Sequence, residues 1–264
     1  MYVRALASTF GKLFTIPVDG KVDAQPLYLS GVVVPGQGAY NLLIVGTEHD
    51  SIYAFDADTS AELWHVSLLK SGELPSDDRG CGQVAPEIGI TATPVIDPTT
   101  GPNGAIYVVS MSKDASNNYF QRLHALDPTT GAEQFGGPVD IHASYPGTGD
   151  NSSNGNVVFD PKQYKERPGL LLINRVVYTS WSSHCDIRPY TGWVIGYDKY
   201  TLRQVTVLNL APNGNEASGR RPQGGTAHAA HCSELYGGHL GDIGEVNPSP
   251  PHRPRVPSGS RAAR

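Results

Sequence analysis

The sequence has few cysteines, no excess of positive charge and no long hydrophobic run. Only three of its 264 residues are Cys, which is too few for a disulfide-rich framework. With a formal net charge of −5, the chain lacks the positive field that gathers phosphates, so no nucleic-acid partner is expected. No apolar stretch approaches the roughly 18 residues of a membrane span. The N-terminal residues also lack the apolar core of a secretory signal peptide, so none is expected in this chain.

Three motifs of common catalytic and cofactor sites are absent as well. The chain contains no Gly-x-Ser-x-Gly elbow, no phosphate-binding loop and no Gly-x-Gly-x-x-Gly turn. It has instead 30 Gly, 21 Pro and 13 Tyr, together with many Val and Ile. Frequent glycine and proline indicate many turns, and Tyr, Val and Ile favour strands. The composition therefore favours an all-β chain, and all-β folds of this length often form one domain.

An aspartate-centred segment recurs three times along the chain. The aspartates are Asp56, Asp127 and Asp198, and both intervals between them are 71 residues. Apolar residues precede each aspartate, and turn-forming residues follow it. A proline that opens an apolar run precedes each copy, at positions 26, 94 and 168. Two landmarks recurring in the same order indicate structural repeats.

Each repeat predicts four short strands. They are expected at residues 25–29, 41–46, 51–56 and 62–67, then at 93–96, 105–110, 121–127 and 133–139, and finally at 169–173, 176–181, 193–198 and 204–210. A further segment, 11–18, is expected to be a strand of a neighbouring unit.

A four-stranded unit cannot bury both of its faces alone, so such units stack as blades around an axis. We therefore predict an all-β, incomplete β-propeller over residues 9–214, with blades at about 24–69, 91–140 and 166–210. Trp64 and Phe135 are expected to pack between blades. Because three blades do not close a ring, the first and last should expose apolar faces. The expected partners are missing blades or another propeller chain, bound through these open edges.

The repeated aspartates allow two interpretations. Asp56-Ala-Asp58 hints at a calcium loop, but residue 61 is Ala where an EF-hand loop needs Gly. A structural turn, in which Asp caps nearby backbone groups, explains the recurrence better. His228, His231 and Cys232 are also clustered, but their spacing matches no standard zinc pattern. No metal site is therefore expected.

In a propeller, the turns between the second and third strands of each blade share one face with the connections between blades. Eight polar or charged residues fall on these segments and could converge near the axis: Glu48, His49, Asp50, Glu87, Lys113, His184, Asp186 and Arg188. They could serve acid–base chemistry, a cation or a polar ligand, or each could merely lie in a solvated turn. Cys81 and Cys185 fall on the same face and could form a disulfide, which would fit an exported protein.

The repeats resemble those of the pyrroloquinoline-quinone (PQQ)-type β-propellers, the quinoprotein alcohol dehydrogenase-like superfamily. The resemblance rests on residues 52–64 and 123–131 and covers about residues 9–214, and the segments 10–14, 86–91 and 183–186 are similar to a bacterial secreted branch. It implies a periplasmic or extracellular location, and PQQ with Ca²⁺ as the cofactor of complete catalytic members. The superfamily also includes scaffold proteins that bind no quinone.

The chain differs from the catalytic members in two ways. They usually have around eight blades, whereas three are expected here, so we expect a fragment. They often carry two adjacent cysteines over the quinone, and this sequence has no Cys-Cys pair. The leading hypothesis is therefore a binding or scaffold module that is not catalytic by itself. The alternatives are part of a PQQ-dependent alcohol or sugar dehydrogenase, and an extracellular propeller that binds a polysaccharide, a small molecule or a protein.

The last fifty residues differ in composition from the rest. Residues 215–264 carry a net charge of +2 and no Phe or Trp, whereas residues 1–214 carry −7. The tail shows no hydrophobic period, so we expect it to be disordered. Its abrupt start suggests a shifted reading frame, and a linker to another domain is the rival explanation. Residues 1–8 are expected to be a short extension.

Overall fold

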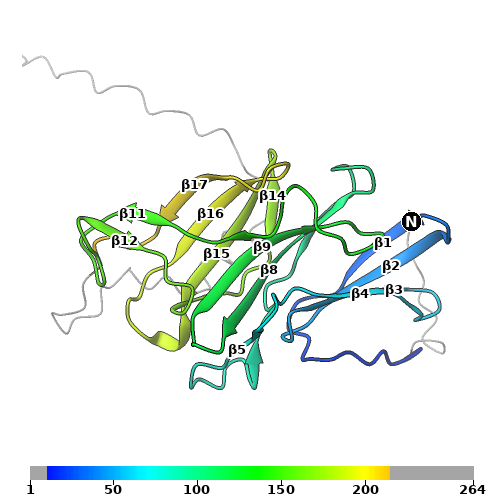
Figure 1. The fold of residues 1–264 in the computed structure, drawn as a ribbon, viewed down its shortest axis with the longest axis horizontal. Helices are drawn as coiled ribbons and strands as arrows, with labels where there is room; N and C mark the ends of the chain where they lie inside the picture. The colour runs from blue at the N-terminus through cyan, green and yellow to red at the C-terminus, as the bar shows by residue number, and fades with distance from the viewer. Residues whose placement is uncertain (1–10, 215–264) are drawn as a thin grey trace, which may run out of the picture.

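The structure is a computed structural model, and residues 11–214 are described here. In that part of the chain regular structure is almost entirely β-strand, with one short 3-10 helix, η1 (His184–Asp186). Three main antiparallel sheets follow one another along the chain and lie side by side (Figure 1). The predicted N-terminal extension and tail lie outside the described residues.

The first blade is a regular four-stranded sheet in sequence order. Its strands are β1 (Leu27–Val34), β2 (Gly38–Gly46), β3 (Ser51–Asp56) and β4 (Glu62–Ser67). All four predicted strands are present. The first two are longer than expected because Gly36 and Gly38 adopt positive φ in the tight turn that joins them, so pairing continues to the end of β1.

The second blade contains the predicted strands and two more. They are β7 (Val95–Asp97), β8 (Ala105–Asp114), β9 (Tyr119–Leu126) and β10 (Val139–Asp140), joined by β5 (Glu73–Asp77) and β6 (Glu87–Ile88). Ten-residue β8 pairs with β7 near its start and with β5 near its end. The strand predicted at 133–139 is wrong for most of its length. Only a single bridge at Glu133 and the two residues of β10 pair with β9.

The third blade repeats this arrangement. Its strands are β14 (Leu171–Ile173), β15 (Val176–Ser183), β16 (Trp193–Asp198) and β17 (Gln204–Asn209), with β13 (Tyr164–Glu166) as the addition. β13 and β14 share the edge of β15, as β5 and β7 share the edge of β8. A hairpin of β11 (Ser144–Pro146) and β12 (Asn156–Val158) fills the connection from the second blade.

Apolar cores join neighbouring blades. Ile44 and Ile52 of the first blade pack with Ile106 and Val108 of the second. Between the second and third blades, the core includes Trp181, Trp193 and Tyr107. Trp64 packs on the first of these cores and donates a hydrogen bond from Nε1 to the Pro128 carbonyl at 2.9 Å, and Phe135 packs on the second. The fold class is confirmed: three propeller blades that are not joined into a closed ring within residues 11–214.

One prediction about the first blade is wrong, because residues 11–18 form no strand. Instead, Ile16 and Val18 pack on Val45, Tyr53 and Phe55 and cover part of the blade. The apolar exposure expected on the first and last blades is present at their edge strands. Tyr28 and Val33 of β1 are 60% and 68% exposed, and Val205 and Leu208 of β17 are 55% and 44% exposed.

The repeated aspartates cap turns. A carboxylate oxygen of Asp56, Asp127 and Asp198 accepts a hydrogen bond from the backbone nitrogen two residues later, at 3.1, 2.7 and 3.0 Å respectively. A threonine hydroxyl nearby donates a second bond in each turn. The carboxylates are thereby engaged in local structure. Within residues 11–214, no helix is long and apolar enough to cross a membrane.

Candidate functional site

The predicted functional face, here called the axial face, comprises the β2–β3, β8–β9 and β15–β16 turns and the connections that lead into β7 and β14. Glu48 in the β2–β3 turn is fully buried. Its Oε2 accepts hydrogen bonds from the Gly89 nitrogen at 2.8 Å and the Thr91 hydroxyl at 2.9 Å, while Oε1 has no partner. Burial raises the pKa of Glu48. A Cβ at Gly89 would lie 2.4 Å from the Glu48 carbonyl oxygen, so this approach requires glycine.

The same turn places two further predicted residues. His49 Nδ1 lies 3.0 Å from Glu87 Oε1, in a partly exposed pair. Asp50 points inward, where its Oδ1 accepts a hydrogen bond from the Met111 nitrogen at 3.2 Å and Oδ2 has no partner. Burial raises the pKa of Asp50 well above its usual range. The structure thus brings Glu48, His49 and Asp50 together with the connection that carries Glu87.

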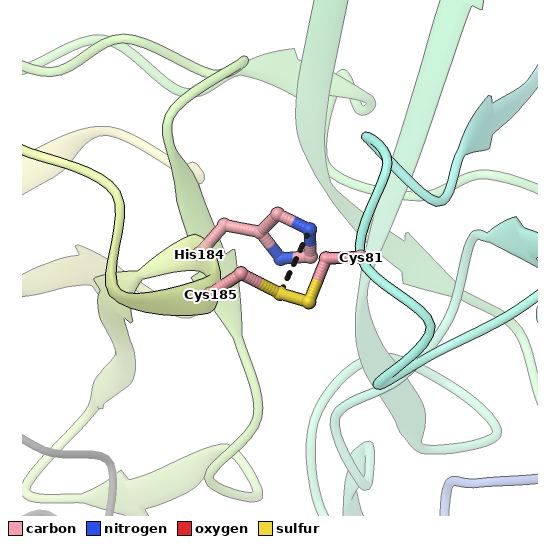
Figure 2. A group of neighbouring side chains, drawn as sticks. All are labelled: Cys81, His184 and Cys185. Atoms are coloured by element: carbon pink, nitrogen blue, oxygen red, sulfur yellow. Dashed lines mark hydrogen bonds between the residues drawn. A yellow bond between two sulfur atoms is a disulfide. The ribbon is translucent and has the colours of Figure 1, made fainter.

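Cys81 and Cys185 form a disulfide, with 6.3 Å between their Cα atoms (Figure 2). The bond joins the connection into the second blade to η1 of the third blade. The His184 ring lies beside it, with Nε2 3.5 Å from the Cys185 sulfur and 3.1 Å from the Asp78 carbonyl oxygen. Burial lowers the pKa of His184, which favours the neutral ring. Asp186 ends η1, and its side chain is outside the described part of the structure.

The other two predicted residues lie in separate ion pairs. Lys113 Nζ is 2.7 Å from Asp77 Oδ2, and this hydrogen bond raises the pKa of Lys113. The Arg188 guanidinium donates to both carboxylate oxygens of Asp150, at 2.8 and 2.7 Å. Neither pair shares a described contact with Glu48 or Asp50. Lys113 lies inside β8 and not in the predicted turn, because β8 continues to Asp114 to pair with β5. Both ion pairs are partly exposed, which fits the alternative of solvated charged groups.

The sequence analysis missed two buried charged residues in β13. Lys165 is 2% exposed, its Nζ has no hydrogen-bond partner, and burial lowers its pKa to about 8. Glu166 is 5% exposed, its Oε1 accepts from the Ser180 nitrogen at 3.3 Å, and burial raises its pKa well above the usual range. The available signal was two adjacent charges shortly before the Pro168 landmark. The repeat pattern predicts the first strand of the third blade only at 169–173, so it gives no indication that these two residues lie in a sheet.

Lys165 lines a small pocket between β6, β8, β9 and β13. Its apolar lining includes Ile88, Val109 and Met111. Its polar lining comes from Thr91, Gln121, Lys165 and Glu166. Thr91 is also the residue that holds Glu48. Glu48 and Lys165 interact electrostatically although they belong to the first and third blades. Thr91 therefore links Glu48 to the pocket that Lys165 lines.

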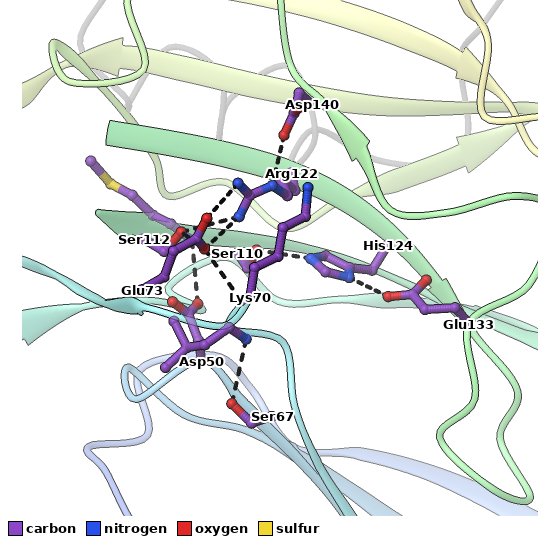
Figure 3. Close-up of polar contacts among 12 residues, drawn as sticks. Asp50, Ser67, Lys70, Glu73, Ser110, Ser112, Arg122, His124, Glu133 and Asp140 are labelled. Carbon is purple, nitrogen blue, oxygen red and sulfur yellow. Dashed lines mark hydrogen bonds and ion pairs between the residues drawn. The ribbon is translucent and has the colours of Figure 1, made fainter. Parts of the chain in front are cut away.

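A second polar cluster lies between the first two blades (Figure 3). The Arg122 guanidinium donates to Glu73, Asp140 and Ser112. Nearby, the Ser110 hydroxyl lies 2.9 Å from His124 Nε2, and His124 Nδ1 contacts Glu133. This is a serine–histidine–carboxylate order, but Ser110 and His124 are each only 2% exposed. Because substrate could not reach the serine, we assign the cluster to blade packing.

The pocket does not fit PQQ with Ca²⁺. A planar quinone needs a flat surface to stack on, and no aromatic ring lines the pocket. Burial favours the protonated forms of Asp50 and Glu166, which are poor ligands for Ca²⁺. No catalytic step through the quinone is therefore derived from the described residues.

Comparisons with known proteins find similarity among solved structures alone. No protein-family model and no curated protein matches it. Among solved structures it is similar to quinohemoprotein alcohol dehydrogenases from Pseudomonas putida HK5 (17% identity, TM-score 0.45, covering 74% of this chain and 21% of that one) and Comamonas testosteroni (13%, 0.39, 73% and 35%). It is also similar to BamB from Moraxella catarrhalis (17%, 0.27, 69% and 53%).

The chain spans about a fifth to a half of the length of these three proteins. TM-scores below 0.5 carry no argument about activity. The propeller architecture rests on the strand order and on the packing between blades in this chain itself.

Proposed function

We propose that the chain is a binding or scaffold module of the propeller type that holds a polar ligand on its axial face. One observation carries this proposal: Glu48, Asp50 and Lys165 are almost fully buried, and each keeps a polar atom without a partner. Burying such an atom costs about 1–3 kcal/mol, and more when it is charged. Such groups cluster at functional sites, where a ligand, an ion or a bound water can supply the missing partner.

The rigidity of the face supports the same proposal. The disulfide Cys81–Cys185 fixes the two connections beside the pocket, and the Glu48 bonds to Gly89 and Thr91 fix a third segment. A ligand would then meet groups already in position, which lowers the entropic cost of binding. The disulfide also fits a periplasmic or extracellular location, which remains part of the proposal.

Ligand-observed NMR on the full chain tests the proposal with glucose, glycine, propionate and inorganic phosphate as probes. Saturable binding of one probe, weakened in Glu48→Gln and kept in Glu62→Gln, is the expected result. Glu62 is an exposed residue of β4 and provides the matched control. If no probe binds, or if both variants bind equally well, the axial face is not a ligand site.

We also propose that the outer side of the third blade receives a further blade, from a longer protein or from another propeller chain. The exposed apolar side chains Val205 and Leu208 on the edge strand β17 support this. Light scattering on the full chain tests it. Association above the monomer mass is expected, and a sharp monomer peak at high concentration would contradict it.

A further inference from the structure

The disulfide and the histidine beside it bring three metal-ligating side chains together on the axial face (Figure 2). One ligand atom each of Cys81, His184 and Cys185 lies within 4.8 Å of the other two. Cys81 comes from the connection into the second blade, whereas the other two belong to η1 of the third blade. The cysteines are 104 residues apart, so no local spacing in the sequence indicates the group. Thiolate sulfur and imidazole nitrogen are ligands that Zn²⁺ prefers in proteins.

The distances among the three groups suit a tetrahedral zinc ion. With Zn–S distances of about 2.3 Å and a Zn–N distance of about 2.0 Å, a sulfur ligand and a nitrogen ligand lie about 3.5 Å apart. The Nε2 atom of His184 lies 3.5 Å from the Cys185 sulfur. Two sulfur ligands lie about 3.8 Å apart around the same ion, so the disulfide must open before zinc binds. The Cα atoms of the two cysteines are 6.3 Å apart, so rotation of the side chains can provide this separation.

The backbone around each ligand is held by hydrogen bonds that do not depend on the disulfide. The Cys81 nitrogen donates to the Asp78 carbonyl at 3.0 Å, and the Gln83 nitrogen donates to the Cys81 carbonyl at 2.8 Å. On the third blade, the His184 nitrogen donates to the Gln163 carbonyl at 3.0 Å. The Asp78 carbonyl also lies 3.1 Å from His184 Nε2, so it joins the two segments without the sulfur atoms. The three ligands should therefore stay close together when the sulfur–sulfur bond opens.

The exposure of the three side chains suits a site that solvent can reach from one side. Cys81 and Cys185 are half-buried, so a reductant and an ion can approach the sulfurs. His184 is 3% exposed and approaches the sulfurs from the protein interior. Three protein ligands leave the fourth position of a tetrahedral ion to a water molecule on the open side.

We propose that Cys81, Cys185 and His184 form a Zn²⁺ site when the disulfide is reduced. A dithiol reductant transfers two electrons and two protons to the disulfide, becomes a disulfide itself, and leaves two thiols in this chain. Zn²⁺ then binds both sulfurs as thiolates, and the two thiol protons pass to solvent. The His184 Nε2 atom binds the ion through its lone pair, and its proton moves to Nδ1, so the ring stays neutral.

The disulfide form and the zinc form of this site exclude each other. Each form joins the connection into the second blade to η1, so the two segments stay linked in either state. The redox conditions around the protein decide which form is present. The site is separate from the proposed ligand site, because neither Glu48 nor Lys165 takes part in it.

The full chain carrying Cys232→Ser tests the proposal, since Cys232 is the third cysteine of the sequence. After reduction with a phosphine, Co²⁺ should give the charge-transfer and visible absorption bands of a tetrahedral thiolate site, and Zn²⁺ should displace it. The oxidised chain should show no such bands. His184→Gln should weaken Zn²⁺ binding by roughly tenfold or more. His142→Gln, at an exposed histidine, is the matched control and should leave binding unchanged.

A measurement on the unmodified chain covers the case in which a variant does not fold. In the reduced chain, Zn²⁺ should slow alkylation of both Cys81 and Cys185, read by peptide mass spectrometry, whereas Mg²⁺ should not. Tryptophan fluorescence should show that the reduced chain is folded when zinc is present. Equal alkylation with and without Zn²⁺ would overturn the inference. So would equal binding by His184→Gln and His142→Gln, or a reduced chain that stays unfolded in the presence of zinc.

Discussion

The guanidinium of Arg122 forms a two-pronged ion pair with the carboxylate of Glu73, with 2.7 Å between each nitrogen and its oxygen partner. Both side chains are at least 93% buried. Burial alone would raise the pKa of Glu73, but the hydrogen bonds from Arg122 and Ser112 lower it. The pair fixes β5 against the second blade and thereby positions the connection that continues to Cys81.

We expect Arg122→Met to be strongly destabilising because it leaves the Glu73 carboxylate buried without its partner. Loss of one member of a buried pair costs about 3–5 kcal/mol. The double variant Arg122→Met/Glu73→Gln should recover part of that loss, since no charge is then buried. Urea unfolding followed by tryptophan fluorescence measures both. If adding Glu73→Gln to Arg122→Met lowers the stability further, as a substitution at an independent site would, the result contradicts the pairing.

The Asp97–Lys199 pair predicts acid sensitivity at the junction of the second and third blades. Lys199 Nζ lies 2.6 Å from Asp97 Oδ2, and both side chains are largely buried. Burial opposes ionisation, but the hydrogen bonds from Lys199 and Thr100 hold the pKa of Asp97 well below its usual range. A lowered folded-state pKa stabilises the protein above the unfolded-state pKa, and this stabilisation is lost as the pH falls.

We therefore expect thermal stability to fall below about pH 4, where unfolded Asp becomes protonated. Asp97→Asn should lose about 2 kcal/mol at pH 7 and should show a weaker decline in acid. Asp58→Asn is a suitable control, because Asp58 is an exposed turn residue. Calorimetry from pH 3 to pH 7 provides the measurement, and parallel curves for Asp97→Asn and the unmodified chain would refute the assignment.

Glu166 predicts the opposite pH dependence. Its folded-state pKa is raised by burial, so its contribution to stability is complete below the unfolded-state pKa and is lost as the pH rises through the folded-state pKa. Glu166→Gln should match the unmodified chain at pH 4 and be about 1 kcal/mol more stable at pH 8, because a neutral amide needs no ionisation. Glu62→Gln, on an exposed strand face, should show no such gain. The same calorimetry decides the question.

The disulfide Cys81–Cys185 should dominate the stability of the axial face. It closes a loop with a sequence separation of 104 residues, and its loss should cost about 2–4 kcal/mol. Cys81→Ser/Cys185→Ser should therefore unfold at lower denaturant concentration than the unmodified chain. Peptide mapping without reductant should recover the linked peptides. Two alkylated thiols at these positions in protein prepared without reductant would show that the bond does not form.

The blade strands could be predicted from the sequence, but the short strands at the inner edges of the second and third blades could not. The 71-residue spacing of Asp56, Asp127 and Asp198 reflects turn chemistry that acts locally, so these turns and their flanking strands could be located from the sequence. β5, β6 and β13 could not, because strands of two to five residues are stabilised by pairing with β8 and β15 rather than by their own pattern. The strand at 133–139 was mispredicted because its apolar residues pack in the core without pairing continuously.

The candidate site could be predicted only in part, because local sequence patterns locate some of its residues and not others. Glu48, His49 and Asp50 follow directly from a recognisable strand end, and the structure places them with Glu87 and the second blade. Lys165 could not be found, because its burial depends on contacts between blades that are distant in sequence. Arg188 lies on a predicted connecting segment, whereas Lys113 lies inside β8, and each has its own partner, Asp150 and Asp77 respectively.

The pairing of β5 with β8, and of β13 with β15, affects the dynamics of the axial face. Because β5 and β13 are hydrogen-bonded to the blades, the segments that carry Glu73 and Lys165 are parts of the sheets and not loose lids. Their amides should exchange with deuterated solvent as slowly as those of the blade interiors. A ligand would then enter a framework that opens only when a blade opens, so its residence time would be set by the unfolding of the sheet edge.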